Sequence, residues 1–104
     1  MKMYILIRDA VPDQLAPVIA AHASLACYKK FEDDPDMQEW MNSIFYKVVC
    51  KVNDTEFEKA QELDKCLSLT ESSLENKEVC LVFCPRVEYP RYFKFFRMWK
   101  PNAK

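Results

Sequence analysis

The sequence predicts a small α/β domain, in which a mixed four-stranded sheet carries helices on its faces. Three observations indicate this fold class. Short apolar runs alternate along the chain with segments of helical periodicity. The 104 residues suffice for one domain, residues 1–104, with one hydrophobic core. Half of the residues are hydrophobic and 30% are charged, which is typical of a globular protein rather than of a disordered chain.

The N-terminal part of the chain predicts a strand followed by a long helix. Residues 3–7 (MYILI) are short, apolar and bounded by charge, as in a buried strand. A helix then extends to about residue 30, because Pro17 falls in or near its first turn, where proline is tolerated. Its small residues let another element approach closely. Its apolar stripe at helical spacing consists of Leu15, Val18, Ile19, His22, Leu25 and Ala26.

The middle of the chain predicts a short helix, a strand and a further helix. Asp34 can cap a helix that starts at Pro35, with an apolar face made of Met37, Trp40, Met41 and Ile44. Residues 45–52 alternate as a strand does, with Tyr46, Val48, Cys50 and Val52 on one side. Thr55 and Glu58 have the spacing of a capping box, so we expect a helix over about residues 55–65.

The C-terminal part predicts two strands and a helical tail. Residues 67–70 form a short strand, 71–78 a turn, and the apolar run 79–84 (VCLVFC) a central strand. Pro85 and Pro90 frame a bend before the tail, residues 91–100. At helical spacing the tail has one aromatic and one basic stripe: Tyr92, Phe95, Phe96 and Trp99, and Arg91, Lys94 and Arg97. Such rings form a core or a subunit contact, or alternatively stack on nucleic-acid bases.

The connections predict the directions of the strands. Helical crossovers make the first three strands parallel and place the helices on the faces of the sheet. The turn at residues 71–78 is too short for a crossover, so the last strand runs antiparallel to its predecessor.

Composition excludes several functional classes. A net charge of −1 gives no global attraction to nucleic acid, and the apolar run at the start is too short for a membrane span. Glycine is absent, which excludes glycine-rich phosphate loops and disfavours nucleotide cofactors, so we expect no cofactor. The five widely spaced cysteines indicate a cytoplasmic protein with reduced thiols. Cys80 and Cys84 are close enough for a zinc site, but buried small hydrophobic residues are the favoured interpretation, so we expect no metal.

Four local sequences carry a resemblance to a known family. The first strand ends in Arg8-Asp9, and the first helix contains AAHAS, residues 20–24, followed by Tyr28-Lys29-Lys30. KVVCKV, residues 47–52, precedes Asn53-Asp54, and the last strand ends in Cys84-Pro85. Together these sequences resemble the type 2 peptidyl-tRNA hydrolase superfamily of archaea and eukaryotes, in which a Gly-Pro stands at the last position. Residues 84–96 (CPRVEYPRYFKFF) look more like a branch of that superfamily distinct from the hydrolases themselves.

The resemblance implies a partial active site. The hydrolases cleave the ester between a peptide and the tRNA 3′ end, with a histidine and a lysine from the first helix and an aspartate and a threonine from a later loop. His22 stands at the histidine position, but Leu15 replaces the lysine. Glu71 stands near the aspartate, and Ser72 and Ser73 are the hydroxyls nearest to the threonine. The stabiliser of the developing oxyanion would have to come from Lys47, Lys51 or Arg8.

Three hypotheses follow for the function. The first is an altered site near His22 that binds a small ligand or an RNA end, with tRNA or another small ligand as the partner. The second is an active hydrolase in which His22 and Glu71 handle water and Ser72 or Ser73 assists. The third is a homodimeric interaction module that uses the tail aromatics. The structural alternative is a hydrogen-bonded His22 on a helix face and a solvated turn at residues 71–73.

Overall fold

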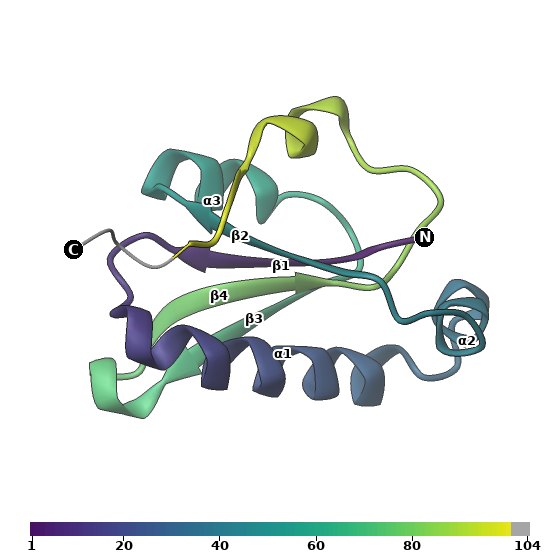
Figure 1. The fold of residues 1–104 in the computed structure, drawn as a ribbon, viewed down its shortest axis with the longest axis horizontal. Helices are drawn as coiled ribbons and strands as arrows, with labels where there is room; N and C mark the ends of the chain where they lie inside the picture. Colours follow the sequence, from purple (N-terminus) through teal and green to yellow (C-terminus); the bar gives the residue numbers. More distant parts are fainter. Residues whose placement is uncertain (101–104) are drawn as a thin grey trace.

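A five-stranded sheet forms the centre of the molecule (Figure 1). The computed structural model describes residues 1–100; residues 101–104, which the predicted domain includes, lie outside the described part. The order across the sheet is β3-β4-β1-β2-β5. The strands are β1 (Met3–Arg8), β2 (Lys47–Val52), β3 (Cys66–Glu71), β4 (Lys77–Phe83) and β5 (Arg97–Met98).

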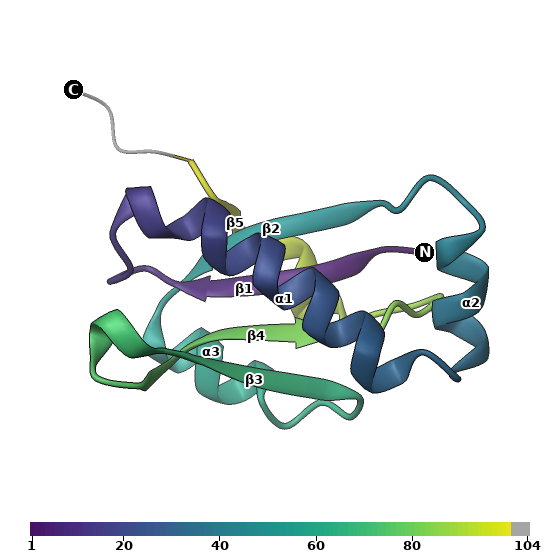
Figure 2. The same ribbon diagram turned by 90° about the horizontal axis from the view of Figure 1, so that it is seen from below.

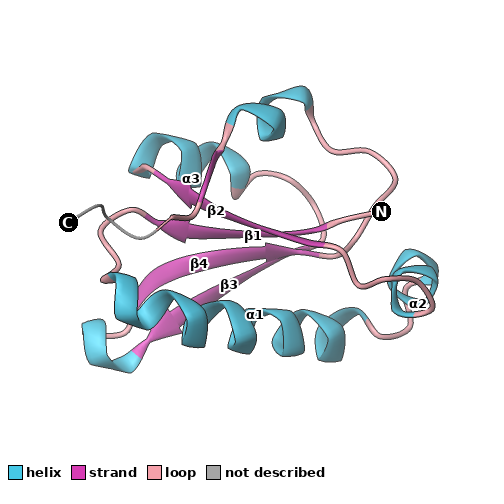
Figure 3. Ribbon diagram, viewed as in Figure 1, coloured by secondary structure: helices cyan, strands magenta, loops and turns pink. Residues whose placement is uncertain are grey.

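Helices cover both faces of this sheet, which confirms the predicted α/β class (Figures 1 and 3). The long helix α1 (Ala16–Phe31) runs diagonally across one face, as Figure 2 shows from below. The helix α3 (Asp54–Ala60) and the 3₁₀ helix η3 (Arg91–Phe95) lie over the other face. The helix α2 (Pro35–Met41) lies at the end of the sheet near the N-terminus. Two further 3₁₀ turns are η1 (Asp13–Leu15) and η2 (Ser72–Leu74).

The pairing of the strands differs in part from the prediction. β1, β2 and β3 run in one direction, as expected from their helical connections, but only β1 and β2 are hydrogen-bonded to each other in parallel. β4 lies between β1 and β3 and is antiparallel to both. The four-stranded prediction was wrong because it missed β5, which pairs antiparallel with the outer edge of β2.

The predicted tail helix is also wrong. The tail makes one 3₁₀ turn, after which its backbone extends along β2 with the register Lys51↔Arg97. Phe93 and Phe96 are both buried against the sheet, and their three-residue spacing matches the period of a 3₁₀ turn. The free edge of β2 then supplies hydrogen-bonding partners that a continued helix would leave unused.

Alternation along β1 creates the two halves of the core. Met3, Ile5 and Ile7 pack under α1, whereas Tyr4 and Leu6 point to the face covered by α3 and η3. β4 divides in the same way, whereas β2 is buried on the α3 side and only partly covered on the α1 side.

The buried stripe of α1 is rotated relative to the predicted one. Its fully buried members are small or aliphatic, namely Ala16, Ile19, Ala23 and Cys27, which lets the helix lie close to the sheet. Val18 and Leu25, predicted to be buried, are 63% and 62% exposed. The sequence misled here because α1 is apolar on most of its circumference, so periodicity alone does not identify the buried side.

The two short helices start at capped positions. Asp34 caps α2 through its Oδ1, which accepts from the Asp36 backbone N–H at 2.9 Å, as predicted. The capping box of α3 is formed by Asn53 and Glu56 rather than by Thr55 and Glu58. The helix therefore begins at Asp54 rather than at about residue 55, and it ends at Ala60 rather than at about residue 65.

Candidate active site

A hollow of about 310 Å³ opens between α1 and the end of β3. Val18, Ile19 and His22 line it from α1, and the remaining walls come from β3 and the turn that follows: Leu69, Thr70, Glu71, Ser72 and Asn76. His22 is exposed, and its side chain has no hydrogen bond or ion pair within residues 1–100. The histidine is therefore not held on a helix face by a neighbour, and it is accessible to a molecule in the hollow.

Glu71 is positioned by the turn that it begins. As the last residue of β3 it caps η2, and its Oε1 accepts from the Ser73 backbone N–H at 3.3 Å and from Ser73 Oγ at 3.1 Å. The Asn76 backbone N–H donates to the Glu71 carbonyl at 3.0 Å and closes the turn. One carboxylate oxygen is thus committed to the turn, which holds the side chain in place.

The four predicted site residues are distributed unequally around this hollow. His22, Glu71 and Ser72 line it. Ser73 does not line it, but its backbone N–H and its hydroxyl both donate to the Glu71 carboxylate. Two further polar residues, Thr70 and Asn76, also line it and were missed by the sequence reasoning. Their position in the sequence could have indicated them, since polar residues at the end of a strand often border ligand sites in α/β sheets.

Within residues 1–100, no lysine or arginine lines the hollow. Leu15, at the position of the family's lysine, is partly buried against the core beneath α1. Lys47 lies over the Trp40 and Phe45 rings, and Lys51 lies over the Trp99 ring at 4.5 Å. The cationic stabiliser expected from the resemblance is therefore absent from the walls of the hollow.

Arg8 belongs to a second hollow, on the other side of the turn at residues 72–76. Its Nη1 donates to Asp54 Oδ1 at 2.7 Å, its Nε donates to the Glu78 carbonyl at 2.7 Å, and its guanidinium lies 3.7 Å from the Phe57 ring centre. This hollow has a volume of about 710 Å³ and is also lined by Ser73 and Lys77. Because three neighbours hold the Arg8 guanidinium, Arg8 lines this second hollow and does not supply a positive charge to the hollow at His22.

The cysteines are unsuited to chemistry in the folded chain. All five are free, and four of them are buried. Burial raises the pKa of the Cys27 and Cys50 thiols to about 12 and that of Cys66 to about 11. Within residues 1–100 no group of three or more histidine, cysteine or acidic side chains is arranged to hold a metal ion. The same residues contain no helix that is long and apolar enough to span a membrane.

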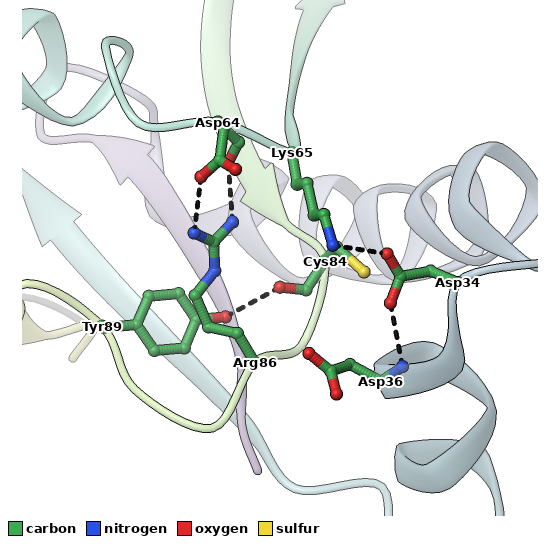
Figure 4. A network of polar contacts seen from close by, with 7 residues as sticks. All are labelled: Asp34, Asp36, Asp64, Lys65, Cys84, Arg86 and Tyr89. Carbon is green, nitrogen blue, oxygen red and sulfur yellow. Dashed lines mark hydrogen bonds and ion pairs between the residues drawn. The ribbon is translucent and has the colours of Figure 1, made fainter.

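A polar network, shown in Figure 4, lies at the end of the sheet away from the hollow at His22. Lys65 Nζ lies 2.7 Å from Asp34 Oδ2, and this hydrogen bond lowers the pKa of Asp34 and raises that of Lys65. Arg86 donates to the side chain of Asp64 at 2.9 Å and to its carbonyl at 2.6 Å, which lowers the pKa of Asp64. Tyr89 donates to the Cys84 carbonyl at 3.2 Å and to the Lys2 carbonyl at 2.8 Å. These contacts fasten the tail and α2 to the sheet near the start of β3, whereas the hollow at His22 lies at the end of that strand.

Comparisons with known proteins place this arrangement in a family. The family model described as peptidyl-tRNA hydrolase PTH2 matches residues 1–80, which contain His22, Glu71, Ser72 and Ser73. A search of curated proteins finds no match. The matched part extends from β1 into β4 and is about three quarters of the chain. The chain therefore belongs to the peptidyl-tRNA hydrolase PTH2 family.

Proposed function

We propose that the hollow around His22 binds the acylated 3′ end of an RNA, such as that of an aminoacyl-tRNA or peptidyl-tRNA, and that its hydrolytic equipment is altered. The family relationship supports an RNA ester as the ligand. The observation that carries the proposal is the composition of the hollow: an accessible imidazole, a fixed carboxylate and two hydroxyl groups line one space, to which no lysine or arginine of residues 1–100 contributes. This lining suits hydroxyl and ester groups better than phosphate.

The lack of a cation is the reason for proposing binding with little cleavage. Ester hydrolysis develops negative charge on the carbonyl oxygen, and fixed donors or cations that stabilise this charge supply a large part of the rate. His22 can polarise a water molecule and Glu71 can orient it, but the remaining donors of the hollow are neutral hydroxyl and amide groups. The altered site therefore keeps the groups that contact the ligand and lacks the charged stabiliser.

Binding can be tested through the histidine itself. Because His22 is the only histidine of the chain, its Cε1–H signal in an NMR spectrum is assigned without ambiguity. We expect N-acetyl-phenylalanyl-adenosine, an acylated 3′ end without phosphate, to shift this signal in a saturable manner. Glu71→Gln should weaken the binding. Leu25→Ala, one turn further along the exposed side of α1 and outside the hollow, is the matched control and should bind normally. No shift at millimolar ligand would refute the proposal.

The second candidate is an active hydrolase, which the shared hollow of His22, Glu71 and Ser72 favours. It predicts cleavage of N-acetyl-phenylalanyl-tRNA that His22→Ala abolishes and Leu25→Ala does not. Our proposal predicts saturable binding of the acylated 3′ end with only slow cleavage. Multiple turnovers that depend on His22 would therefore decide for the hydrolase.

The third candidate is the homodimeric interaction module. Phe95 and Met98, 72% and 54% exposed, are the tail residues that could form such a contact. This candidate predicts a mass in solution of twice the 12.3 kDa of one chain.

A further inference from the structure

Charge is distributed very unevenly along the chain. Residues 1–80, the part matched by the family model, contain nine lysine and arginine residues against fifteen acidic ones. Residues 81–104 contain six basic residues and one acid, Glu88. The near-neutral total therefore conceals an acidic body with a basic C-terminal segment. A local positive field of this kind attracts polyanions even when the net charge of the chain does not.

The basic residues of this segment border two hollows. The first, of about 470 Å³, has the side chains of Lys2, Arg86, Arg91 and Lys94 in its walls and Glu88 as its one carboxylate. The second, of about 410 Å³, is lined by Lys51, Arg97, Met98 and Lys100. The first hollow lies on the side of the sheet covered by η3, and the chain then passes through η3 to the edge strand β5, where Lys51 and Arg97 of the second hollow point to the α1 side of the sheet (Figure 1).

Most of these cations remain available to a ligand. Arg91 and Lys94 are exposed, and neither has an ion pair or a side-chain hydrogen bond within residues 1–100. Arg97 lies only 3.9 Å from the exposed Asp9, a contact of little energy in water. Two cations are engaged: Asp64 fixes the Arg86 guanidinium, and Lys51 Nζ lies over the Trp99 ring and donates to the Lys100 carbonyl at 3.3 Å. The first hollow thus combines one anchored cation with several free ones.

An exposed ring stands between the two groups of basic residues along the chain. Of the predicted aromatic stripe, Phe96 is buried and Tyr92 and Trp99 are partly buried against the core, and Phe93, which the stripe did not include, is buried as well. Phe95, between the free Lys94 and the hollow at Arg97, is 72% exposed. An exposed phenylalanine flanked by cations is the arrangement by which proteins stack an unpaired base while holding the adjoining phosphates.

We infer that the outer surface of residues 86–98 binds a single-stranded nucleic acid, whose phosphates occupy the two basic hollows and one of whose bases stacks on Phe95. We name this surface, made of Arg91, Lys94, Phe95 and Arg97 together with Lys2 and Lys51 from the walls of the two hollows, the tail track. It is separate from the hollow at His22 and lies mostly outside the part matched by the family model. The inference does not rest on the proposed function, because it requires neither an acyl ester nor the imidazole.

The charge of the tail track can be tested with the full chain and a fluorescein-labelled 12-nucleotide RNA that carries no acyl group. We expect saturable anisotropy changes at low salt, with an affinity that falls as salt rises. The double variant Arg91→Glu/Lys94→Glu should weaken binding at least tenfold and reduce the salt slope by about 1.4, since each single-strand phosphate contact contributes about 0.7. The matched control, Lys29→Glu/Lys30→Glu, makes the same change of charge at the exposed end of α1 and should bind nearly as the wild type does.

Phe95→Ala tests the stacking. It should weaken binding of the single strand roughly tenfold, as loss of one stacked base does, while leaving binding to a duplex of the same length unchanged. Because Phe95, Arg91 and Lys94 are exposed, the variants should melt like the wild type. Equal losses in the two charge variants, equal affinity for duplex and single strand, or no binding at about 100 µM protein, the weak end of non-specific binding, would each overturn the inference. If a mononucleotide at the same total phosphate concentration displaced the labelled RNA completely, an extended binding surface would likewise be excluded.

Discussion

Lys65 Nζ lies 2.7 Å from Asp34 Oδ2 and joins the residue before β3 to the residue that caps α2. The two residues are 31 positions apart in sequence, and the Asp34 side chain is only 14% exposed. The same carboxylate accepts from the Asp36 backbone N–H through its other oxygen. Asp34 therefore has two structural tasks: it starts a helix and it fastens that helix to the sheet.

Replacing Asp34 should consequently destabilise the fold. Loss of an N-cap costs about 1 kcal/mol, so we expect Asp34→Ala to lower the free energy of unfolding at pH 7 by about 1–2 kcal/mol. Denaturant unfolding measures the change. Asp33→Ala is the control, because this exposed neighbour makes no contact of the kind that Asp34 makes. Similar effects of the two substitutions would contradict the role assigned to Asp34.

The same residue predicts a dependence on pH. The hydrogen bond from Lys65 lowers the pKa of Asp34, so the unfolded chain takes up a proton there at a higher pH than the folded chain does. The stabilisation is therefore complete above the ordinary aspartate pKa of about 3.9 and is lost as the pH falls through the lower, folded value. We expect the difference in unfolding free energy between wild type and Asp34→Ala to shrink below about pH 3.9. A difference that stays constant down to pH 2 would contradict this assignment.

Glu75 holds a backbone conformation that favours glycine, in a chain that has none. Its φ is 60°, and the next residue, Asn76, has a φ of 57°. Asparagine tolerates this left-handed region, whereas glutamate loses about 1 kcal/mol or more in it. We expect Glu75→Gly to raise the free energy of unfolding by about 0.5–1 kcal/mol, after the larger entropy of the unfolded glycine chain is subtracted.

A matched substitution separates this effect from the loss of a surface charge. Glu58→Gly removes the same side chain from an exposed position inside α3 and should lower the free energy of unfolding by about 1 kcal/mol. Opposite signs for the two variants, measured by thermal and denaturant unfolding, are the expected outcome. A loss of stability in Glu75→Gly would show that the turn does not store this strain.

Local signals made much of this fold predictable. The run at 79–84 is apolar in every position, and residues 79–83 of it form the buried part of β4. Asp34-Pro35 marked the start of α2 to the residue. The prediction failed where long-range contacts decide the structure. β5 exists because β2 offers a free edge, and no pattern within residues 91–100 reveals that edge. The orientation of α1 likewise depends on which of its several apolar sides meets the sheet.

The sequence indicated three of the residues that line the hollow, His22, Glu71 and Ser72, but not its full lining. The spacing of His22 and Glu71 along the chain gives no measure of their separation in space, and it was the resemblance that brought them together. The structure adds that Thr70 and Asn76 share their hollow, because a strand end and a left-handed turn residue face α1. The structure also places the two adjacent serines in different hollows: Ser72 lines the hollow at His22, and Ser73 lines the hollow at Arg8 on the other side of the turn.

The thiols should be inert while the chain is folded. Burial raises the pKa of Cys66 and Cys84 to about 11, so only about one thiol in a thousand is ionised at pH 8, and the thiolate is the reactive form. We expect slow labelling by an aromatic disulfide reagent at pH 8, with the partly exposed Cys66 modified first. In guanidinium chloride all five cysteines should react rapidly. Fast modification of any cysteine in the folded protein would show an access route that the structure does not have.

Phe95 and Phe96 are adjacent in sequence but should respond oppositely to truncation. Phe96 is 9% exposed and its ring centre lies 5.0 Å from that of Phe93, so Phe96→Ala opens a cavity and should cost about 3–5 kcal/mol of unfolding free energy. Phe95 is 72% exposed, and Phe95→Ala should change stability by less than about 0.5 kcal/mol.

Because Phe95 is exposed and Phe96 is buried, the homodimer has to be tested by a substitution at Phe95. Phe96→Asp would disrupt the core of one chain, so a changed mass in that variant could reflect unfolding. Phe95→Asp leaves the core intact and alters only the surface, and light scattering then reports the contact itself. A dimer through the tail predicts that wild type has twice the mass of Phe95→Asp. Equal masses would exclude the dimeric module and leave Phe95 free to stack on a nucleic-acid base.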